Sequence, residues 1–216
     1  MAWPQPVTLR SGRVTLEPLE RRHEADLAEA VKDGELWRLW YTSVPSPEGM
    51  RAEIERRLGL QAAGSMLPFA VIDTPPGEAA GHGAGKAVGM TTYMNIDATN
   101  RRVEIGSTWY RKAVQRSDLN TRCKLLLLGH AFETLSCIAV ELRTHVFNRP
   151  SRAGIERLGA KLDGILRSHQ VAPNGTLRDT CVYSIIAAEW PTAKAHLEFQ
   201  LARPDRAEDG RPERKS

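Results

Sequence analysis

The order of apolar and polar positions along the chain predicts a domain in which strands and helices alternate unevenly. Runs that alternate between apolar and polar residues and are rich in β-branched or aromatic side chains predict strands, whereas apolar residues three or four positions apart predict helices. A strand or a hairpin is expected at residues 7–19, and strands are expected at residues 66–73, 86–96, 103–110, 138–146, 160–167 and 178–187. Helices are expected at residues 21–32, 48–60, 119–132, 149–158 and 189–199. This order is typical of a mixed α/β (α+β) domain with a largely antiparallel sheet.

Turn residues separate these elements. Ser11-Gly12 is expected to form a turn or bulge in the first strand segment, and Asn174-Gly175 is a strong turn signal. Residues 74–85 are rich in Gly, Pro and Ala and predict a surface loop between two paired strands. Because no helical pattern follows this loop, it does not predict a phosphate-binding loop, and His82 within it does not predict a metal site.

The candidate functional segment is residues 100–133. Its strand, residues 103–110, leads into a polar loop at residues 111–117 that is rich in Lys, Arg and Gln. A helix follows, with Asp118 or Asn120 as its predicted cap. Free main-chain N–H groups and the positive end of the helix dipole meet at such a position. The pattern therefore predicts an anion-binding site.

Three aromatic residues, Trp37, Trp40 and Tyr41, stand close together before the second helix. Two interpretations stay open for them. They anchor the core, since Trp is mostly buried in folded proteins, or they form the wall of a substrate cleft.

The composition indicates a soluble globular protein. The 216 residues suit one domain, and 41% of them are hydrophobic and 26% charged. A net charge of +4 is compatible with a small polyanionic ligand, but it does not predict nucleic-acid binding, because Lys and Arg are dispersed among a similar number of acids. No apolar run approaches the ~20 residues of a membrane-spanning helix, and no signal peptide is evident.

The three cysteines, Cys123, Cys137 and Cys181, are odd in number, widely spaced and set in apolar surroundings. They predict reduced, buried thiols of a cytoplasmic protein rather than a metal site or a disulfide framework. Residues 203–216 are polar and charged, and they predict a disordered tail.

Several short motifs follow one another along nearly all of residues 7–195. They are R-x-x-E-I-G at 101–106, Q-R-S-x-L-N-T at 115–121, K-L-L-L-L-G-H-A-F-E at 124–133, N-x-x-S-R at 148–152, I-E-R-L-G-A at 155–160, G-x-L-R-S-H at 164–169 and R-D-T at 178–180, with Tyr183-Ser184 and Glu189-Trp190 after them. Each motif alone is weak. Their order and spacing resemble the GNAT (Gcn5-related) N-acetyltransferases, in particular the RimJ/RimL-like branch.

The resemblance implies a single domain over residues 1–200. Its sheet would be mixed and mostly antiparallel, with about seven strands splayed at the centre and flanked by helices. The splay between the two central strands opens the slot for acetyl-CoA in such folds. The implied reaction transfers an acetyl group to a primary amine, either a protein N-terminus or a small-molecule amine, by direct attack on the thioester.

Two residues match catalytic positions of the family. Glu104 matches the position proposed for the base, which is needed because an ammonium group must lose a proton before it can attack. Its alternative role is an ion pair with Arg101, Arg102 or Arg143. Ser151 matches the proton donor to the CoA thiolate in RimL-like members, whereas many other members use a Tyr. Its alternative role is to cap the helix that follows.

The resemblance assigns the pyrophosphate of the cofactor to the start of the long helix. The residues concerned are Gln115, Arg116, Ser117, Asp118, Leu119, Asn120 and Thr121. The main chain of residues 107–110, including Trp109 and Tyr110, would pair with the pantetheine amides as an added strand would. Asn148 would hydrogen-bond the pantetheine or CoA backbone, and Arg152 would either reach the phosphates or lie solvated on its helix.

Asp118 departs from the family pattern, which has a glycine-type residue at this position. Asp adopts left-handed backbone more readily than most residues, so the turn can survive. However, its carboxylate would lie near the phosphates, and like charges at ~4–6 Å repel by about 1 kcal/mol even in water. Arg111, Lys112, Arg116 and Arg122 supply compensating charge. The departure predicts weakened affinity for CoA.

The acceptor is expected on the other side of the slot, lined by Trp37, Trp40, Tyr41 and Tyr93. His145 is either a further polar group there or a structural histidine. An alternative function is a GNAT-fold module that binds an acyl-CoA or a protein partner with weak or no transferase activity. The departure in the cofactor loop favours this alternative, and an exposed sheet edge would allow a homodimer.

Overall fold

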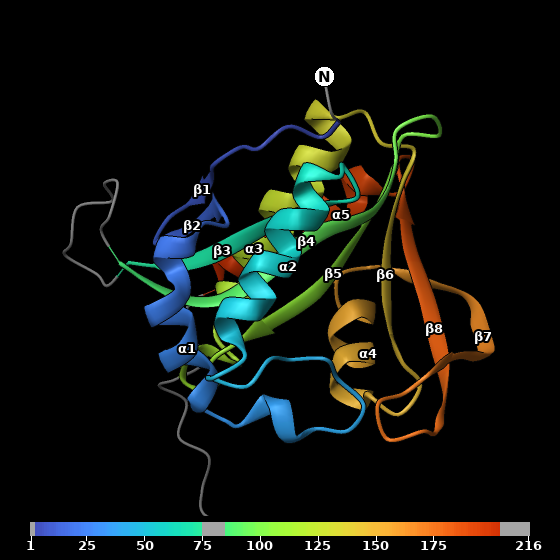
Figure 1. Cartoon of the computed structure of the whole chain (residues 1–216). Coiled ribbons are helices and arrows are strands. Elements are labelled where there is room, and N and C mark those ends of the chain that lie inside the picture. The colour runs from blue at the N-terminus through green and yellow to red at the C-terminus, as the bar shows by residue number, and fades with distance from the viewer. Residues whose placement is uncertain (1–2, 75–84, 204–216) are drawn as a thin grey trace, which may run out of the picture.

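The computed structural model describes residues 3–74 and 85–203 (Figure 1). The strands are β1 (Leu9–Ser11), β2 (Val14–Pro18), β3 (Met66–Asp73), β4 (Lys86–Asp97), β5 (Arg102–Tyr110), β6 (Ala139–His145), β7 (Lys161–Val171) and β8 (Leu177–Ile186). The α-helices are α1 (Glu24–Lys32), α2 (Met50–Ala62), α3 (Leu119–Gly129), α4 (Arg149–Glu156) and α5 (Trp190–Ala202). Shorter helical turns are η1 (Arg21–His23), η2 (Leu36–Arg38), η3 (Lys112–Val114) and η4 (His130–Thr134).

Within the described residues the strands form one eight-stranded sheet in the order β1-β2-β3-β4-β5-β6-β8-β7. All neighbouring strands are antiparallel except β5 and β6, which confirms the predicted mixed and mostly antiparallel sheet. The sheet has eight strands instead of about seven because residues 7–19 fold into a hairpin, whose turn contains Gly12 at a φ of +56°. The other predicted strands and helices occur within a few residues of their expected bounds.

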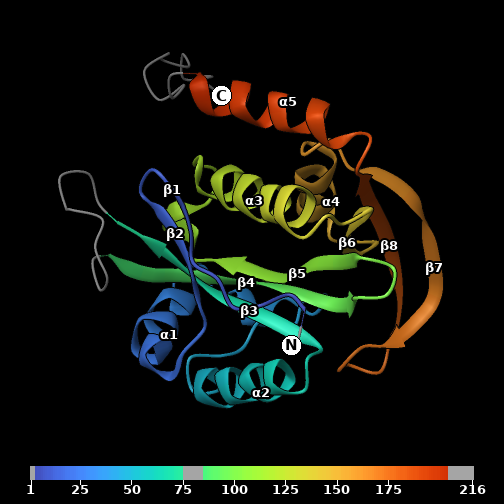
Figure 2. The ribbon, with the colours of Figure 1, turned by 90° about the horizontal axis from the view of Figure 1, so that it is seen from above.

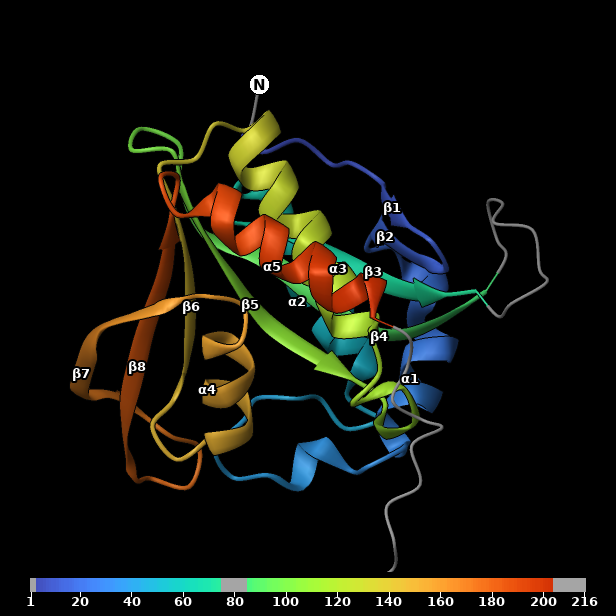
Figure 3. The ribbon, with the colours of Figure 1, turned by 180° about the vertical axis from the view of Figure 1, so that it is seen from behind.

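Helices cover both faces of the sheet. Figure 2 shows α1 and α2 on one face and α3 on the other, with α5 outside α3, and Figure 3 shows α5 lying along α3. The first face has a core that includes Leu27, Met50 and Ile54, whereas the core under α3 includes Leu119 and Leu127. Because both faces are covered, β3 is almost continuously apolar, as expected for a strand without a solvent-facing side.

The two central strands separate soon after they meet. β5 and β6 pair only at Arg102 with Ala139, Val103 with Val140 and Glu104 with Glu141. Beyond Glu104, β5 continues to Tyr110 without β6 as a neighbour, and α4 occupies the widening space beside the two strands (Figure 1). This is the splay that the resemblance implied.

The predictions for turn glycines and cysteines are confirmed, whereas those for one loop and the tail fall mostly outside the described residues. Gly159, with a φ of +90°, lies in the turn that follows α4, and Gly175, with a φ of +81°, lies in the predicted turn between β7 and β8. Cys123, Cys137 and Cys181 are buried free thiols, as predicted. Most of the predicted loop at 74–85 and of the predicted tail at 203–216 lies outside the described residues.

Candidate active site

A β-bulge in β5 shapes the wall of the splay. Thr92 of β4 pairs with Gly106 and Met90 pairs with Trp109, so Thr91 faces two residues, Ser107 and Thr108. Ser107 has a φ of +46°, which is uncommon for a residue with a Cβ. The bulge turns the β5 backbone at the point where β6 has already moved away.

Arg57 of α2 holds this bulge from the face covered by α1 and α2. Its side chain is 1% exposed, and its guanidinium donates to Glu53 Oε1 at 2.7 Å, Thr92 Oγ1 at 2.6 Å and the carbonyl oxygen of Ser107 at 3.3 Å. Burial removes water from the guanidinium, and the hydrogen bonds to one carboxylate and two further acceptors offset this desolvation cost. Nothing in the sequence singled out Arg57, because it reads as an ordinary polar position of an amphipathic helix.

Glu104, the predicted base, lies at the last paired position before the splay. It is 5% exposed, its Oε2 accepts from Asn95 Nδ2 at 2.7 Å, and Arg143 Nε lies 3.4 Å from the same oxygen. Burial raises the pKa of Glu104 above its ordinary value, although Asn95 and Arg143 oppose this effect. Its Oε1 has no hydrogen-bond donor in the described part of the chain, so one oxygen remains available for a proton.

A second carboxylate, Glu141, lies directly opposite Glu104 on β6 and was not singled out from the sequence. Arg143 donates to Glu141 Oε2 at 2.7 Å, and Arg102 donates to Glu141 Oε1 at 2.6 Å. These contacts lower the pKa of Glu141 despite its partial burial. Two adjacent carboxylates whose pKa values move in opposite directions therefore lie at the base of the splay, and only Glu104 has the raised value.

At the other side of the splay, Asn148 and not Ser151 caps α4. Asn148 Oδ1 accepts from the main-chain N–H of Ser151 at 3.2 Å. The Ser151 hydroxyl has no hydrogen bond within the described residues, so capping does not account for this serine. Arg152 donates to the Tyr183 hydroxyl at 3.0 Å and to the Val146 carbonyl at 3.4 Å, so its guanidinium is not simply solvated.

The loop between β5 and α3 is held by its own side chains. Gln115 Nε2 donates to the Tyr110 carbonyl at 2.8 Å, and Ser117 Oγ donates to the Val114 carbonyl at 2.7 Å. The left-handed residue of the loop is Arg116, with a φ of +64°. Among the described residues no acceptor is found for the main-chain N–H groups of Asn120 and Thr121, as expected in the first turn of a helix.

Asp118 lies at the N-cap position of α3, but its side chain makes no capping bond. Its backbone is right-handed, with a φ of −73°, so it is not the left-handed turn residue. Instead, its carboxylate accepts from Arg122 Nε at 2.6 Å and from Arg13 Nη2 at 3.4 Å. Arg122 was among the predicted compensating charges, whereas Arg13, from the β1–β2 turn, was not. Arg111 pairs with Asp33 instead.

The segment between α1 and α2, residues 33–49, crosses below the open end of the splay (Figure 1). On the β5 side, Asp33 Oδ2 accepts from the main-chain N–H of Ala113 at 2.8 Å. On the β6 side, Trp40 meets His145 edge-on at a centroid distance of 5.1 Å and lies 6.2 Å from the ring of Phe147. The segment therefore connects both arms of the splay.

The structure brings together only part of the predicted acceptor set. Tyr41 also lies near His145, at a ring distance of 6.3 Å, while Trp37 packs partly buried against the α1/α2 core. Tyr93 is fully buried under α3, where its hydroxyl donates to the Leu127 carbonyl. Phe147 is an added member of the aromatic cluster that the sequence did not indicate. We refer to Trp40, Tyr41, His145 and Phe147 as the mouth cluster.

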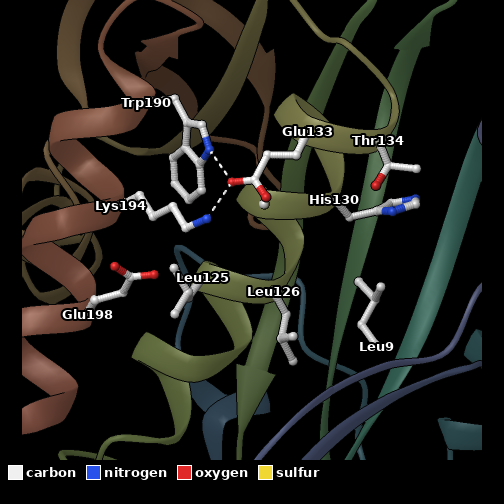
Figure 4. Close-up of a pocket in the computed structure, with 10 residues that line it drawn as sticks. Leu9, Leu125, Leu126, His130, Glu133, Thr134, Trp190, Lys194 and Glu198 are labelled. Atoms are coloured by element: carbon white, nitrogen blue, oxygen red, sulfur yellow. Dashed lines mark hydrogen bonds and ion pairs between the residues drawn. The ribbon is translucent and has the colours of Figure 1, made fainter.

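A surface cavity of about 320 Å³ lies elsewhere, between the outer side of α3 and α5 (Figure 4). Its lining includes Leu125, Leu126 and His130, and Glu133 there accepts from Trp190 and Lys194. None of the predicted site residues lines it, so its size does not make it the active site.

Residues 3–74 and 85–203 contain neither a metal-binding cluster nor a membrane-spanning helix. No group of three or more His, Cys, Asp or Glu residues there is arranged to hold a metal ion. No helix in the same residues combines the length and apolar character needed to span a membrane.

Comparisons with known proteins agree with this geometry. A family model described as an acetyltransferase (GNAT) domain matches residues 13–161. The chain is 34% identical over 110 residues to "Putative ribosomal N-acetyltransferase YdaF" of Bacillus subtilis, and this match spans 51% of the chain and 59% of that protein. A GCN5-related N-acetyltransferase from Brucella melitensis has 32% identity and a TM-score of 0.78, over 92% of this chain and 87% of that one. Mycobacterium smegmatis RimJ in complex with CoA-disulfide shares the fold, with a TM-score of 0.71 and 22% identity over 94% and 97% of the two chains.

Proposed function

Because this chain belongs to the acetyltransferase (GNAT) family, we propose that it transfers an acetyl group from acetyl-CoA to a primary amine. The same comparisons agree with the RimJ/RimL-like resemblance and support an acyltransferase enzyme. One observation carries the proposal. The β5–β6 splay has an open helix N-terminus at one end and a buried carboxylate with a raised pKa, Glu104, at the other.

The residues around the splay fit an acyl-CoA. Unpaired N–H groups at the start of α3 suit a pyrophosphate, and β5 beyond Glu104 lacks a strand partner on the side of β6, as a strand-like pantetheine arm requires. RimJ, whose fold this chain shares, is described in complex with CoA-disulfide. Residues 115–121 would hold the phosphates, and the main chain of residues 107–110 would hold the arm.

Acetyl-CoA, when bound, supplies a thioester as acyl donor, and the residues of this chain handle the protons. Glu104 takes a proton from the ammonium group of the acceptor through its free Oε1, directly or through a water, so that the neutral amine can attack the thioester carbon. Its raised pKa makes it a better proton acceptor than an exposed Glu. Ser151, whose hydroxyl has no capping duty, gives a proton to the departing thiolate. Asn95 and Arg143 keep the Glu104 side chain in place, and Glu141 in turn holds Arg143.

The mouth cluster is the proposed entrance for the acceptor. Trp40 and Phe147 are 47% and 62% exposed, so their rings are available to a ligand. The exposed aromatic faces suit the chain that follows a protein N-terminus, whereas His145 is buried behind them and its Nδ1 accepts from the main-chain N–H of Phe147 at 3.1 Å. The relative described as a ribosomal N-acetyltransferase supports a protein N-terminus over a small-molecule amine.

The proposal is tested by release of free thiol from acetyl-CoA with a panel of peptide N-termini and small amines. The Glu104→Gln variant should lower turnover by about 10²–10⁴-fold. Because the pKa of Glu104 is raised, the wild-type rate should fall with decreasing pH already above the ordinary Glu value of 4.5, and the variant should lose this limb. Glu24→Gln, a change at a partly exposed carboxylate of α1 that pairs with Arg51, is the control. An unchanged rate in Glu104→Gln would assign this residue to structure alone.

The alternative is a binding module without transfer. Its main support was the charge of Asp118, and two arginines neutralise that charge in the structure. Binding of CoA without turnover on any amine of the panel would nevertheless favour it over the enzyme.

A further inference from the structure

A second buried cation, Lys124, lies on the opposite side of the β5 bulge from Arg57. It belongs to the second turn of α3, is 6% exposed, and faces β5 under the helix. Its Nζ donates to Thr108 Oγ1 at 3.2 Å, and the same hydroxyl lies 2.8 Å from Thr91 Oγ1. Thr108 is on the part of β5 that has already separated from β6, so the ammonium group lies beside the wall of the splay.

The bonds of this ammonium group are incomplete. A lysine has three N–H donors, and within the described residues Nζ of Lys124 has one acceptor, a neutral hydroxyl. None of the ion pairs among these residues includes Lys124, although a buried charge is ordinarily paired. A buried cation with unused donors at the edge of a binding slot indicates that a ligand completes its bonds.

We propose that Lys124 is a cofactor-binding residue, whose ammonium group, held by Thr108, donates to a carbonyl oxygen of the pantetheine arm of CoA. The inference rests on the proposed function, because the arm must run along residues 107–110. The proposed contact of Lys124 is with the arm and not with the phosphates. Its acceptor Thr108 lies on β5, where the arm would run, whereas the phosphates would lie at the main-chain N–H groups that begin α3. A neutral carbonyl oxygen also fits this position better than a phosphate, because Lys124 supplies only one positive charge.

The surroundings of Lys124 leave it as the titrating group. Burial lowers the pKa of Lys124 to about 8. Cys123, its neighbour on α3, has a pKa raised to about 12 by burial, and burial raises the pKa of Tyr110 on β5 well above its ordinary value. The negative charge of Asp73 on β3 also raises the pKa of Cys123, and Asp73 itself pairs with Arg13 at 3.4 Å. From these elements, Lys124 is therefore the group that changes charge between pH 7 and pH 9.5.

The test compares two probes by calorimetry. Desulfo-CoA keeps the pantetheine arm and lacks the thiol, which would itself titrate. Adenosine 3′,5′-bisphosphate carries the nucleotide end without the arm. Lys124→Met should weaken binding of desulfo-CoA about tenfold, as for one lost charged hydrogen bond, and leave binding of the bisphosphate within about twofold. Lys194→Met, a lysine-to-methionine change at the partly exposed α5 lysine that pairs with Glu133, should alter neither.

The pH profile and a second variant test the same point without removing the lysine. In the wild type the ratio of the two affinities should shift against desulfo-CoA from pH 7 to pH 9.5, and this shift should be absent in Lys124→Met. Thr108→Val, which removes the single acceptor of Lys124, should weaken desulfo-CoA selectively. An unchanged ratio in both variants and across pH would overturn the inference and leave the proposed function standing. Failure of the wild type to bind desulfo-CoA at all would overturn the proposed function as well.

Discussion

Arg57 and Lys124 are two buried cations that grip one bulge from opposite faces of the sheet, and their bonds differ. Arg57 has a carboxylate, a hydroxyl and a main-chain carbonyl as acceptors, whereas Lys124 has a hydroxyl alone. Burial lowers the pKa of both side chains, that of Lys124 to about 8. The protein thus supplies several acceptors to the cation on one face of the sheet and only one acceptor to the cation on the other face.

The difference separates a structural cation from a functional one. A buried charge whose partners are all internal stabilises one arrangement of the backbone and is lost only at high cost. A buried charge without an internal counter-charge destabilises the free protein and gains its partners when a ligand arrives. Arg57 on the α2 face therefore fixes the bulge, whereas Lys124 on the α3 face has donors left for a ligand in the slot.

The largest predicted effect on stability comes from removing the structural cation, Arg57. Arg57→Leu should lower the free energy of unfolding by about 3–5 kcal/mol, because Glu53, Thr92 and the Ser107 carbonyl lose a buried donor. Chemical denaturation measures this change. Arg56→Leu is the matched control, since Arg56 pairs with the same Glu53 at the surface and should cost below about 1 kcal/mol. Equal effects of the two changes would show that burial of Arg57 is not what matters.

The next effect has the opposite sign. A pKa of about 8 in the folded chain, against 10.5 as the ordinary value, means that the unfolded chain binds more protons between these limits. Lys124 therefore destabilises the folded protein below pH 8, and this loss disappears as the pH rises toward 10.5. Lys124→Met should raise the free energy of unfolding by up to about 3 kcal/mol at pH 7 and much less at pH 10. A variant that is less stable than the wild type at pH 7 would contradict an unpaired buried charge.

The smallest effect concerns a charge that is paired and partly exposed. Asp118→Asn should change stability by less than about 1 kcal/mol, because its ion pairs lie near the surface. It should also tighten desulfo-CoA binding by about two- to fivefold, since it frees Arg13 and Arg122 to act on the phosphates. Glu55→Gln, which breaks an exposed pair with Arg21, is the control. Weaker binding in Asp118→Asn would show that its ion pairs position the loop.

The sequence predicted what depends on neighbouring residues. The continuous apolar run of β3, the turn at Asn174-Gly175 and the helix after the basic loop follow from periodicity and turn chemistry that act over a few residues. The family resemblance added the splay and located Glu104, and both lie where it implied.

The remaining features depend on residues far apart in the chain. Arg13 meets Asp118 across 105 positions, and Arg57 reaches Ser107 across 50, so no local pattern signals either contact. Tyr93 illustrates the converse case. Its aromatic ring suited a cleft wall, but the bulge in β5 and the packing of α3 put the side chain in the core, where its hydroxyl finds a main-chain acceptor.

The three residue pairs that join β5 to β6 also bear on how the chain folds. Strands β3, β4 and β5 are consecutive antiparallel neighbours whose pairs lie close together in the chain, whereas β6 meets β5 only through three parallel pairs, each 37 positions apart (102 and 139, 103 and 140, 104 and 141). Short-range contacts form faster than distant ones, and weakly joined units open separately. We expect native-state hydrogen exchange to divide the sheet between Glu104 and Glu141, with the amides of β8 exchanging through an opening that leaves β3 and β4 closed. Uniform exchange across both groups of strands would show instead that the splayed sheet unfolds as one unit.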